Sequence, residues 1–245
     1  MKSPITALVL AFGLASSLAG DSLFTSNSLG RSILQANDRL ARTWFLEVTG
    51  GPVAGVSGDL ARANDEFPGI SLYSQDFEGL YGNAWLLGFR FGKHLGVYDA
   101  YFRFAYTQAD GRQDQIGTSG GTDIQAIFSD YTDFALLGGV RREFLQPSRL
   151  HPYLGFETGV RFVDGIEMDV LELGTLPIYD DSAVFSAEVT AGISYDLTDA
   201  FRIGLETGLR FQGSLEQIDG TVLENYNSSD SLLFVPILLT GTLNF

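Results

Sequence analysis

The chain has 245 residues and no cysteine, so neither a disulfide framework nor a thiolate metal site can form. Its 15 Lys and Arg against 30 Asp and Glu give a formal net charge of −15, which argues against nucleic acid as a partner because phosphates need a basic surface. Its 29 Gly, 19 Phe and 10 Tyr would be unusual in a soluble enzyme and are typical of a β-barrel.

The first segment, residues 1–19, has the pattern of a cleaved export signal. Met1-Lys2 forms a short positive region, Ile5–Leu14 is apolar, and Ser17–Ala19 ends in small residues suited to cleavage. An uncleaved membrane anchor would need about 20 apolar residues, and Asp21 interrupts the run too early. We therefore expect export and removal of this segment.

Residues 20–42 follow as a periplasmic N-terminal segment. Two alternatives are open for it: a plain periplasmic tail, or a short amphipathic helix lying on the periplasmic leaflet. The helix would use Leu29, Ile33, Leu34 and Leu40 with Arg31 and Arg39.

Residues 43–245 contain eight segments in which apolar and polar residues alternate with a period of two, the mark of a strand with two different faces. One face of each segment is apolar, and the other carries Gly and charged residues. In chain order the segments are Thr43–Gly50, Leu80–Gly92, Val97–Gln108, Tyr131–Phe144, His151–Val163, Ala183–Asp196, Ala200–Gln212 and Leu233–Phe245.

The connections between these segments alternate strictly in length, which is typical of an outer-membrane barrel with short periplasmic turns and long extracellular loops. The sequence therefore predicts an all-β fold, a closed antiparallel transmembrane barrel of eight strands. Short turns fall at Lys93–Gly96, Leu145–Leu150 and Leu197–Asp199, and long connections at Gly51–Gly79, Ala109–Asp130, Asp164–Ser182 and Gly213–Asp230.

Two other arrangements compete with this prediction. The segments Ile166–Leu171 and Thr175–Tyr179 could form a hairpin that extends the barrel above the membrane or gives it ten strands. A soluble eight-stranded barrel of the lipocalin type would instead turn the apolar faces inward.

Aromatic residues at both ends of the apolar faces favour the membrane barrel, because a bilayer-facing wall carries an aromatic ring at each interface. One ring comprises Trp44, Phe91, Tyr98, Phe144, Tyr195, Phe201 and Phe245, and the other Tyr81, Tyr106, Phe162, Phe185 and Phe211.

The last strand has Leu239, Gly241, Leu243 and Phe245 at alternate positions. This ending resembles the C-terminal signal read by the outer-membrane barrel assembly machinery. The pattern from Thr43 to Phe245 resembles the small eight-stranded outer-membrane barrels of the OmpA and OmpX type. The resemblance implies a monomer in the bacterial outer membrane, in contact with membrane lipid and lipopolysaccharide.

Charged residues on the polar faces are expected to point into the lumen, which in an eight-stranded barrel is just wide enough for side chains. Buried acids there must pair with guanidinium groups. The network is either a structural plug or a gated path for ions or small solutes. It comprises Glu47, Arg90, Asp99, Arg103, Arg141, Glu157, Arg161, Glu188, Arg202, Glu206 and Arg210.

The long connections are acidic, and oxygen ligands of this kind suit hard divalent cations. No connection has the spacing of a dedicated calcium loop, so the alternatives are a solvated, non-adhesive surface and loosely bound Ca²⁺ or Mg²⁺; no other cofactor is expected. The metal candidates are Asp164, Glu167, Asp169, Glu172, Asp180 and Asp181.

Three functions follow from these features, in descending order of support. The first is a structural, surface-interacting barrel that displays acidic loops over a plugged lumen. The second is a narrow, porin-like channel, and the third an outer-leaflet lipid-modifying enzyme. Catalysis has the least support because His94 and His151 lie beside periplasmic turns, without an evident serine partner.

Overall fold

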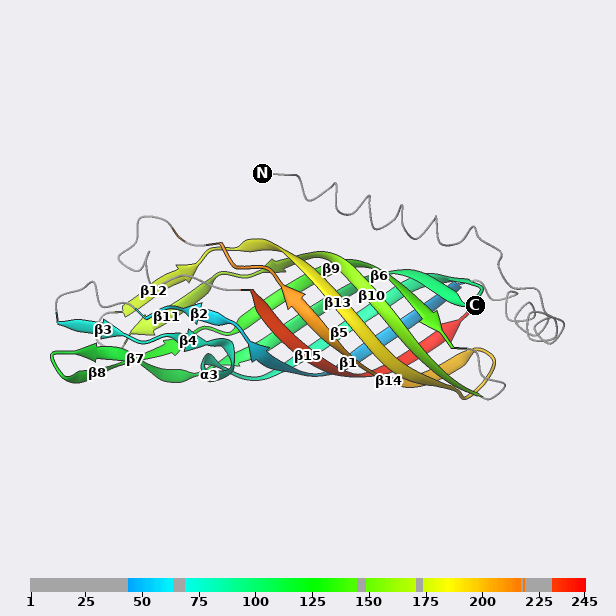
Figure 1. Cartoon of the computed structure of the whole chain (residues 1–245), viewed down its shortest axis with the longest axis horizontal. Helices are drawn as coiled ribbons and strands as arrows, with labels where there is room; N and C mark the ends of the chain where they lie inside the picture. The colour runs from blue at the N-terminus through cyan, green and yellow to red at the C-terminus, as the bar shows by residue number, and fades with distance from the viewer. Residues whose placement is uncertain (1–43, 64–68, 145–148, 171–173, 217, 219–230) are drawn as a thin grey trace.

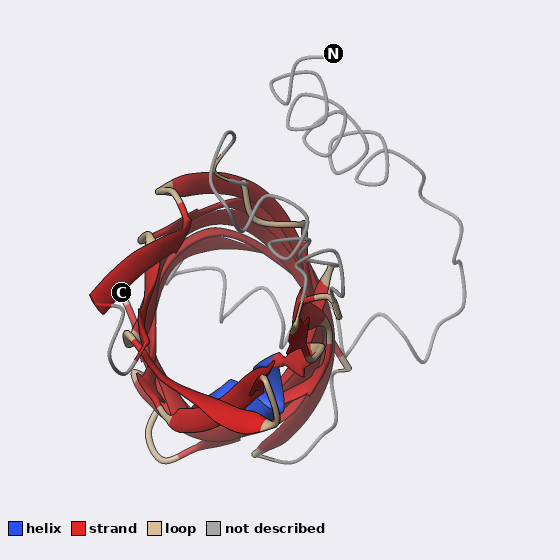
Figure 2. Ribbon diagram, turned by 90° about the vertical axis from the view of Figure 1, so that its left-hand side faces the viewer, coloured by secondary structure: helices blue, strands red, loops and turns tan. Residues whose placement is uncertain are grey.

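The computed structural model describes residues 44–63, 69–144, 149–170, 174–216, 218 and 231–245. The predicted signal 1–19 and the segment 20–42 lie outside these residues. Eight antiparallel strands close a barrel in the order β1-β15-β14-β13-β10-β9-β6-β5 (Figures 1 and 2). The predicted number of barrel strands is therefore confirmed. The barrel strands are β1 (Trp44–Ser57), β5 (Tyr81–Leu95), β6 (Tyr98–Gly111), β9 (Tyr131–Glu143), β10 (Leu150–Val163), β13 (Ser182–Asp196), β14 (Phe201–Gln212) and β15 (Leu232–Asn244).

The apolar faces of the barrel strands point outward. Val48 on β1 is 52% exposed, Leu205 on β14 is 50% exposed and Leu239 on β15 is 70% exposed. The charged residues at the alternate positions of the same strands, such as Glu47 and Glu206, point into the lumen and are buried. A soluble barrel would have the opposite arrangement. This surface is the one that a bilayer stabilises. Within the described ranges no helix combines the length and the hydropathy that crossing a bilayer requires.

Above one end of the barrel the predicted long loops form further strands. A five-stranded sheet, here called the outer sheet, has the order β12-β11-β8-β7-β3 (Figure 1). The hairpin β11–β12 belongs to this sheet, so the ten-stranded alternative is wrong. The outer sheet contains β3 (Ile70–Leu72), β7 (Gln113–Ser119), β8 (Thr122–Phe128), β11 (Ile166–Val170) and β12 (Gly174–Tyr179); beside it β2 (Asp59–Ala61) pairs with β4 (Gln75–Asp76).

A short helix, α3 (Phe77–Leu80), connects β4 to β5. Asp76 caps its N-terminus, because the carboxylate Oδ1 accepts a hydrogen bond from the Gly79 N–H at 2.7 Å. This cap lets the chain turn back toward the barrel, and it buries Phe77 and Leu80. In the view along the barrel axis, α3 lies within the outline of the strands (Figure 2).

Tyr81 departs from the predicted outward aromatic ring. The pairing of β5 with β6 shifts register between Tyr81 and Ala84, and such an irregularity changes which face the preceding residue occupies. Tyr81 is consequently 2% exposed and points inward, whereas Trp85, Phe89 and Phe91 keep the predicted outward orientation.

Pro236 does not end the last strand, although a proline removes a ladder donor. The ladder between β1 and β15 omits Gly51 and Pro52 and resumes at Val53, which pairs with Pro236. Gly51 is required here because a Cβ atom at this position would lie 2.1 Å from the carbonyl oxygen of Ile237. Because glycine has no side chain, the backbones of β1 and β15 can approach closely here, and their pairing continues beyond Pro236.

Candidate functional site

Arg90 on β5 contacts carboxylates from three other strands inside the lumen. Its Nη1 lies 2.6 Å from Glu47 Oε1 on β1. Its Nη2 lies 2.7 Å from Glu157 Oε1 on β10 and 2.6 Å from Glu206 Oε1 on β14. Neither β10 nor β14 is a neighbour of β5, so these bonds cross the lumen and connect opposite walls.

Glu47 and Glu157 extend this contact into a network, because each uses its second oxygen for another arginine. Glu47 Oε2 lies 2.7 Å from Arg141 Nη1, and Glu157 Oε2 lies 2.7 Å from Arg103 Nη1. Glu188 Oε2 lies 3.5 Å from the same Arg103 nitrogen. We call this set the charged layer: Glu47, Arg90, Arg103, Arg141, Glu157, Glu188 and Glu206.

Hydroxyl groups also donate to three acids of the charged layer, Glu47, Glu157 and Glu206. The Tyr101 OH donates to Glu157 Oε1 at 2.9 Å, and the Tyr153 OH donates to Glu206 Oε2 at 2.9 Å. Thr242 Oγ1 donates to Glu47 Oε2 at 2.8 Å. Burial of these charges is tolerable because Glu47, Glu157 and Glu206 each have a guanidinium partner as well as a neutral donor.

Toward the outer end, two further arginines have acidic partners. Arg210 Nε donates to Glu188 Oε2 at 3.1 Å. Arg161 pairs with Asp133, and its Nε donates to Ser186 Oγ at 3.1 Å. The predicted network lacks Asp133, although this residue occupies an inward-facing position of β9 and is buried.

At the short-turn end, the two histidines pair with carboxylates. His94 Nδ1 lies 2.6 Å from Asp99 Oδ1, and Asp99 Oδ2 accepts from Arg141 Nε at 2.7 Å. His151 Nε2 lies 2.9 Å from Asp196 Oδ2. Both imidazoles therefore belong to the polar filling at this rim, far along the barrel from the outer sheet.

Arg202 also pairs at this rim, with its Nη1 2.7 Å from Glu143 Oε1. Sequence reasoning missed Glu143 and Asp196, yet both have the inward parity that identified the others. All of the predicted lumen residues point inward and are buried, with Arg202 the most exposed of them at 6%.

An aromatic cluster lies at the outer end of the lumen. Phe77 of α3 lies between barrel strands, with its ring centre 4.7 Å from Tyr81, 5.2 Å from Tyr131 and 5.0 Å from Phe234. We call Phe77, Tyr81, Tyr131 and Phe234 the aromatic cap. The sequence pattern does not reveal it, because Phe77 lies in a predicted loop and Tyr81 precedes the bulge in β5.

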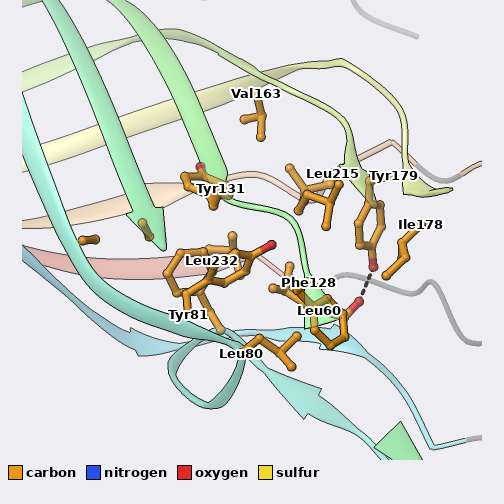
Figure 3. Close-up of a cluster of buried hydrophobic side chains, with 14 of the residues drawn as sticks. Leu60, Leu80, Tyr81, Phe128, Tyr131, Val163, Ile178, Tyr179, Leu215 and Leu232 are labelled. Atoms are coloured by element: carbon orange, nitrogen blue, oxygen red, sulfur yellow. Dashed lines mark hydrogen bonds between the residues drawn. The ribbon is translucent and has the colours of Figure 1, made fainter. Parts of the chain in front are cut away.

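The aromatic cap continues into an apolar core beneath the outer sheet (Figure 3). Leu80 and Leu232 pack beside the cap, and Phe128 and Ile178 extend the core outward. One hydrogen bond crosses this core, from the Tyr179 OH to the Leu60 carbonyl (Figure 3). The outer sheet is thus joined to the barrel by packed side chains.

The acidic candidates for a metal site are distributed over the outer end. Asp164, Glu167, Asp180 and Asp181, together with Glu216, line an open cavity of about 680 Å³. Asp169 is exposed on β11, and Glu172 lies outside the described residues. In the part of the chain that the structure describes, no three His, Asp or Glu side chains are grouped to hold a metal ion. Loose divalent binding stays a prediction.

The residues of the predicted assembly signal lie on the outward face of β15 and just beyond it. Leu239, Leu243 and Phe245 are exposed, and Gly241 is half-buried. The backbone of Phe245 pairs with Trp44 in both directions, with N···O distances of 2.9 and 3.1 Å. The final residue therefore contributes to barrel closure, and its recognition by assembly machinery stays a prediction.

The predicted resemblance to small eight-stranded outer-membrane barrels is confirmed in strand number, strand direction and closure. No protein-family model and no curated protein matches the sequence. Among solved structures, Neisserial surface protein A is 13% identical, with a TM-score of 0.40, and the match covers 82% of this chain and 97% of that one.

Two other solved structures are similarly distant. The attachment invasion locus protein Ail of Yersinia pestis is 12% identical, with a TM-score of 0.38, over 83% of this chain and 99% of that one. The outer membrane protease OmpT of Escherichia coli is 9% identical, with a TM-score of 0.47, over 83% and 97%. At this distance the likenesses carry no functional argument, and function is inferred from the geometry.

Proposed function

We propose that this protein is a bacterial outer-membrane barrel whose role is structural and surface-exposed: it holds an acidic outer sheet above a closed lumen. One observation carries the proposal. The aromatic cap at the outer end of the barrel is continuous with the apolar core beneath the outer sheet. The barrel therefore serves as a rigid base for this sheet.

The side chains that fill the lumen favour a structural plug and argue against a conducting channel. An ion moving along the axis would have to separate Arg90 from its three carboxylates and then displace Phe77 from the rings around it. Breaking a buried ion pair leaves an uncompensated charge, which is strongly unfavourable. A conducting state would thus require rearrangement of both layers.

The outer sheet supports a surface role because its charge is almost entirely of one sign. Asp123, Glu167 and Asp169 are exposed on β8 and β11, and Asp180 and Asp181 follow β12. An ordered surface of this kind repels anionic molecules and attracts cationic ones at low ionic strength. The proposal includes no catalytic step, since both histidines pair with acids at the opposite end of the barrel.

Conductance of the refolded protein in a planar bilayer tests the closed lumen. With insertion confirmed independently, we expect no discrete current steps. Reproducible steps would contradict the plug and favour the narrow channel, with Arg90, Arg103, Glu157 and Glu206 as the residues to replace.

Labelling of intact cells tests the location and orientation. Because the chain has no cysteine, Glu167→Cys in the outer sheet and Asp199→Cys in a short turn each create a single thiol. A membrane-impermeant maleimide should label the first variant on intact cells and the second only after permeabilisation. The reverse result would mean that the outer sheet faces the periplasm.

A further inference from the structure

Two cations lie on the outward face of the barrel near its short-turn end. Lys93 on β5 and Arg142 on β9 are both exposed. Among the described barrel strands, every other Lys or Arg points into the lumen. We call Lys93 and Arg142 the basic belt. At the outer-sheet end of the same strands, the described residues include no outward-facing Lys or Arg.

Aromatic rings hold both cations at this level. Lys93 Nζ lies 5.5 Å from the ring centre of Trp44. Arg142 Cζ lies 5.9 Å from the ring centre of Tyr98 and 5.5 Å from that of Phe144. A cation over an aromatic face is attracted by the ring quadrupole, so these contacts restrict the cations to the depth of the interfacial aromatic ring.

The basic belt occupies one continuous side of the barrel. Trp44 pairs with Lys93 across β1 and β5, and Tyr98 pairs with Arg142 across β6 and β9, so four adjacent strands contribute. The cations are two strand spacings apart, about 10 Å. At the same rim, β13, β14 and β15 present Tyr195, Phe201 and Leu243 without a cation.

Neither cation has a carboxylate partner among the described residues, whereas the lumen arginines do. A cation at a membrane interface is attracted to anionic lipid headgroups. We propose that the basic belt binds the phosphates of anionic glycerophospholipids in the leaflet at the short-turn end. This inference rests on the membrane location in the proposed function.

The two tryptophans of the chain provide reporters at opposite interfaces. Trp44 contacts Lys93 of the basic belt, and Trp85 faces outward at the other end of β5, 5.7 Å from the Tyr106 ring. A Trp85→Phe variant leaves Trp44 as the sole fluorophore, and Trp44→Phe leaves Trp85. Each variant is reconstituted in phosphatidylcholine vesicles that contain phosphatidylglycerol, with bromine on the chains of one lipid at a time. The quenching gives the relative affinity of each lipid for the surface beside the tryptophan.

Around Trp44 we expect phosphatidylglycerol to be enriched about fivefold over phosphatidylcholine at low ionic strength, and less in high salt. Lys93→Gln with Arg142→Gln should abolish this preference, and the matched pair Lys93→Arg with Arg142→Lys should retain it. Around Trp85 none of these variants should reveal a preference.

Equal quenching by the two lipids around Trp44, or a preference that survives the glutamine substitutions, would overturn the inference and leave the membrane location intact. If neither brominated lipid quenched either tryptophan, the barrel would not be embedded, and the proposed function would fail with the inference.

Discussion

The charged layer and the aromatic cap fill successive parts of one lumen by different physical means. In the charged layer, each carboxylate of Glu47 and Glu157 is shared by two arginines from other strands. In the aromatic cap, Phe77 enters from a connecting segment and packs among rings on β5, β9 and β15. The first depends on specific partners, and the second on volume and apolar area.

This difference sets how each part responds to change. Removing one member of an ion-pair network leaves its partners buried without compensation, so the cost exceeds the value of the lost bond. Removing an aromatic ring costs transfer free energy and creates a cavity, which neighbouring side chains can partly fill. The charged layer should therefore be the less tolerant of the two.

Glu157→Ala should have the largest effect, because it removes partners of Arg90 and Arg103 together. We expect a loss of roughly 4 kcal/mol in the free energy of unfolding, measured by urea titration in lipid vesicles. Glu167→Gln, at an exposed position on β11, is the matched control and should cost under about 0.5 kcal/mol. An unchanged urea midpoint for Glu157→Ala would mean that the charged face is solvated.

Phe77→Ala tests the aromatic cap and should cost about 3 kcal/mol. Because the charged layer lies below the cap, the variant should still conduct no current in a planar bilayer. Glu78→Ala, at the exposed neighbouring position of α3, provides the control for the helix itself. Current steps in Phe77→Ala alone would show that the cap, and not the charged layer, closes the lumen.

The residues of the charged layer can be predicted from the sequence one by one, because a period of two assigns each strand position to a face. Which of these residues pair with one another cannot be predicted in this way. Arg90 meets Glu157 and Glu206 only because β10 and β14 lie across the lumen from β5, and that depends on closure and stagger. Parity alone also places Asp133, Glu143 and Asp196 in the lumen, beyond the predicted network.

The aromatic cap and most of the outer sheet lack any comparable pattern, although the segments Ile166–Leu171 and Thr175–Tyr179 do predict the hairpin β11–β12. β3 has three residues, too few to display a period, and it pairs with β7, more than forty residues later. The predicted outward face of Tyr81 is wrong because one irregularity in the β5–β6 ladder reverses parity. Local sequence therefore predicts regular strands and misses structure that depends on distant pairing or on a bulge.

Tyr179→Phe makes the smallest expected change and extends the comparison to the apolar core that continues from the aromatic cap. It removes the hydroxyl that donates to the Leu60 carbonyl in the core beneath the outer sheet (Figure 3). If apolar packing dominates this region, the loss should be about 1 kcal/mol, since the ring stays and one neutral hydrogen bond is lost. Hydrogen exchange should accelerate at the amides of β2 and β12, with the barrel amides unchanged.

Tyr73→Phe is the matched control, because it also removes one tyrosine hydroxyl at the same end of the molecule. Tyr73 is 42% exposed and lies outside the buried core. A cost for Tyr179→Phe comparable with that of Glu157→Ala would contradict the view that apolar packing, and not specific polar contacts, holds the outer sheet on the barrel. The stability of the outer sheet would then depend on specific polar contacts, as that of the charged layer does. A small, local effect would instead mean that the outer sheet is held by apolar area, which leaves its exposed acidic residues free to vary without loss of the fold.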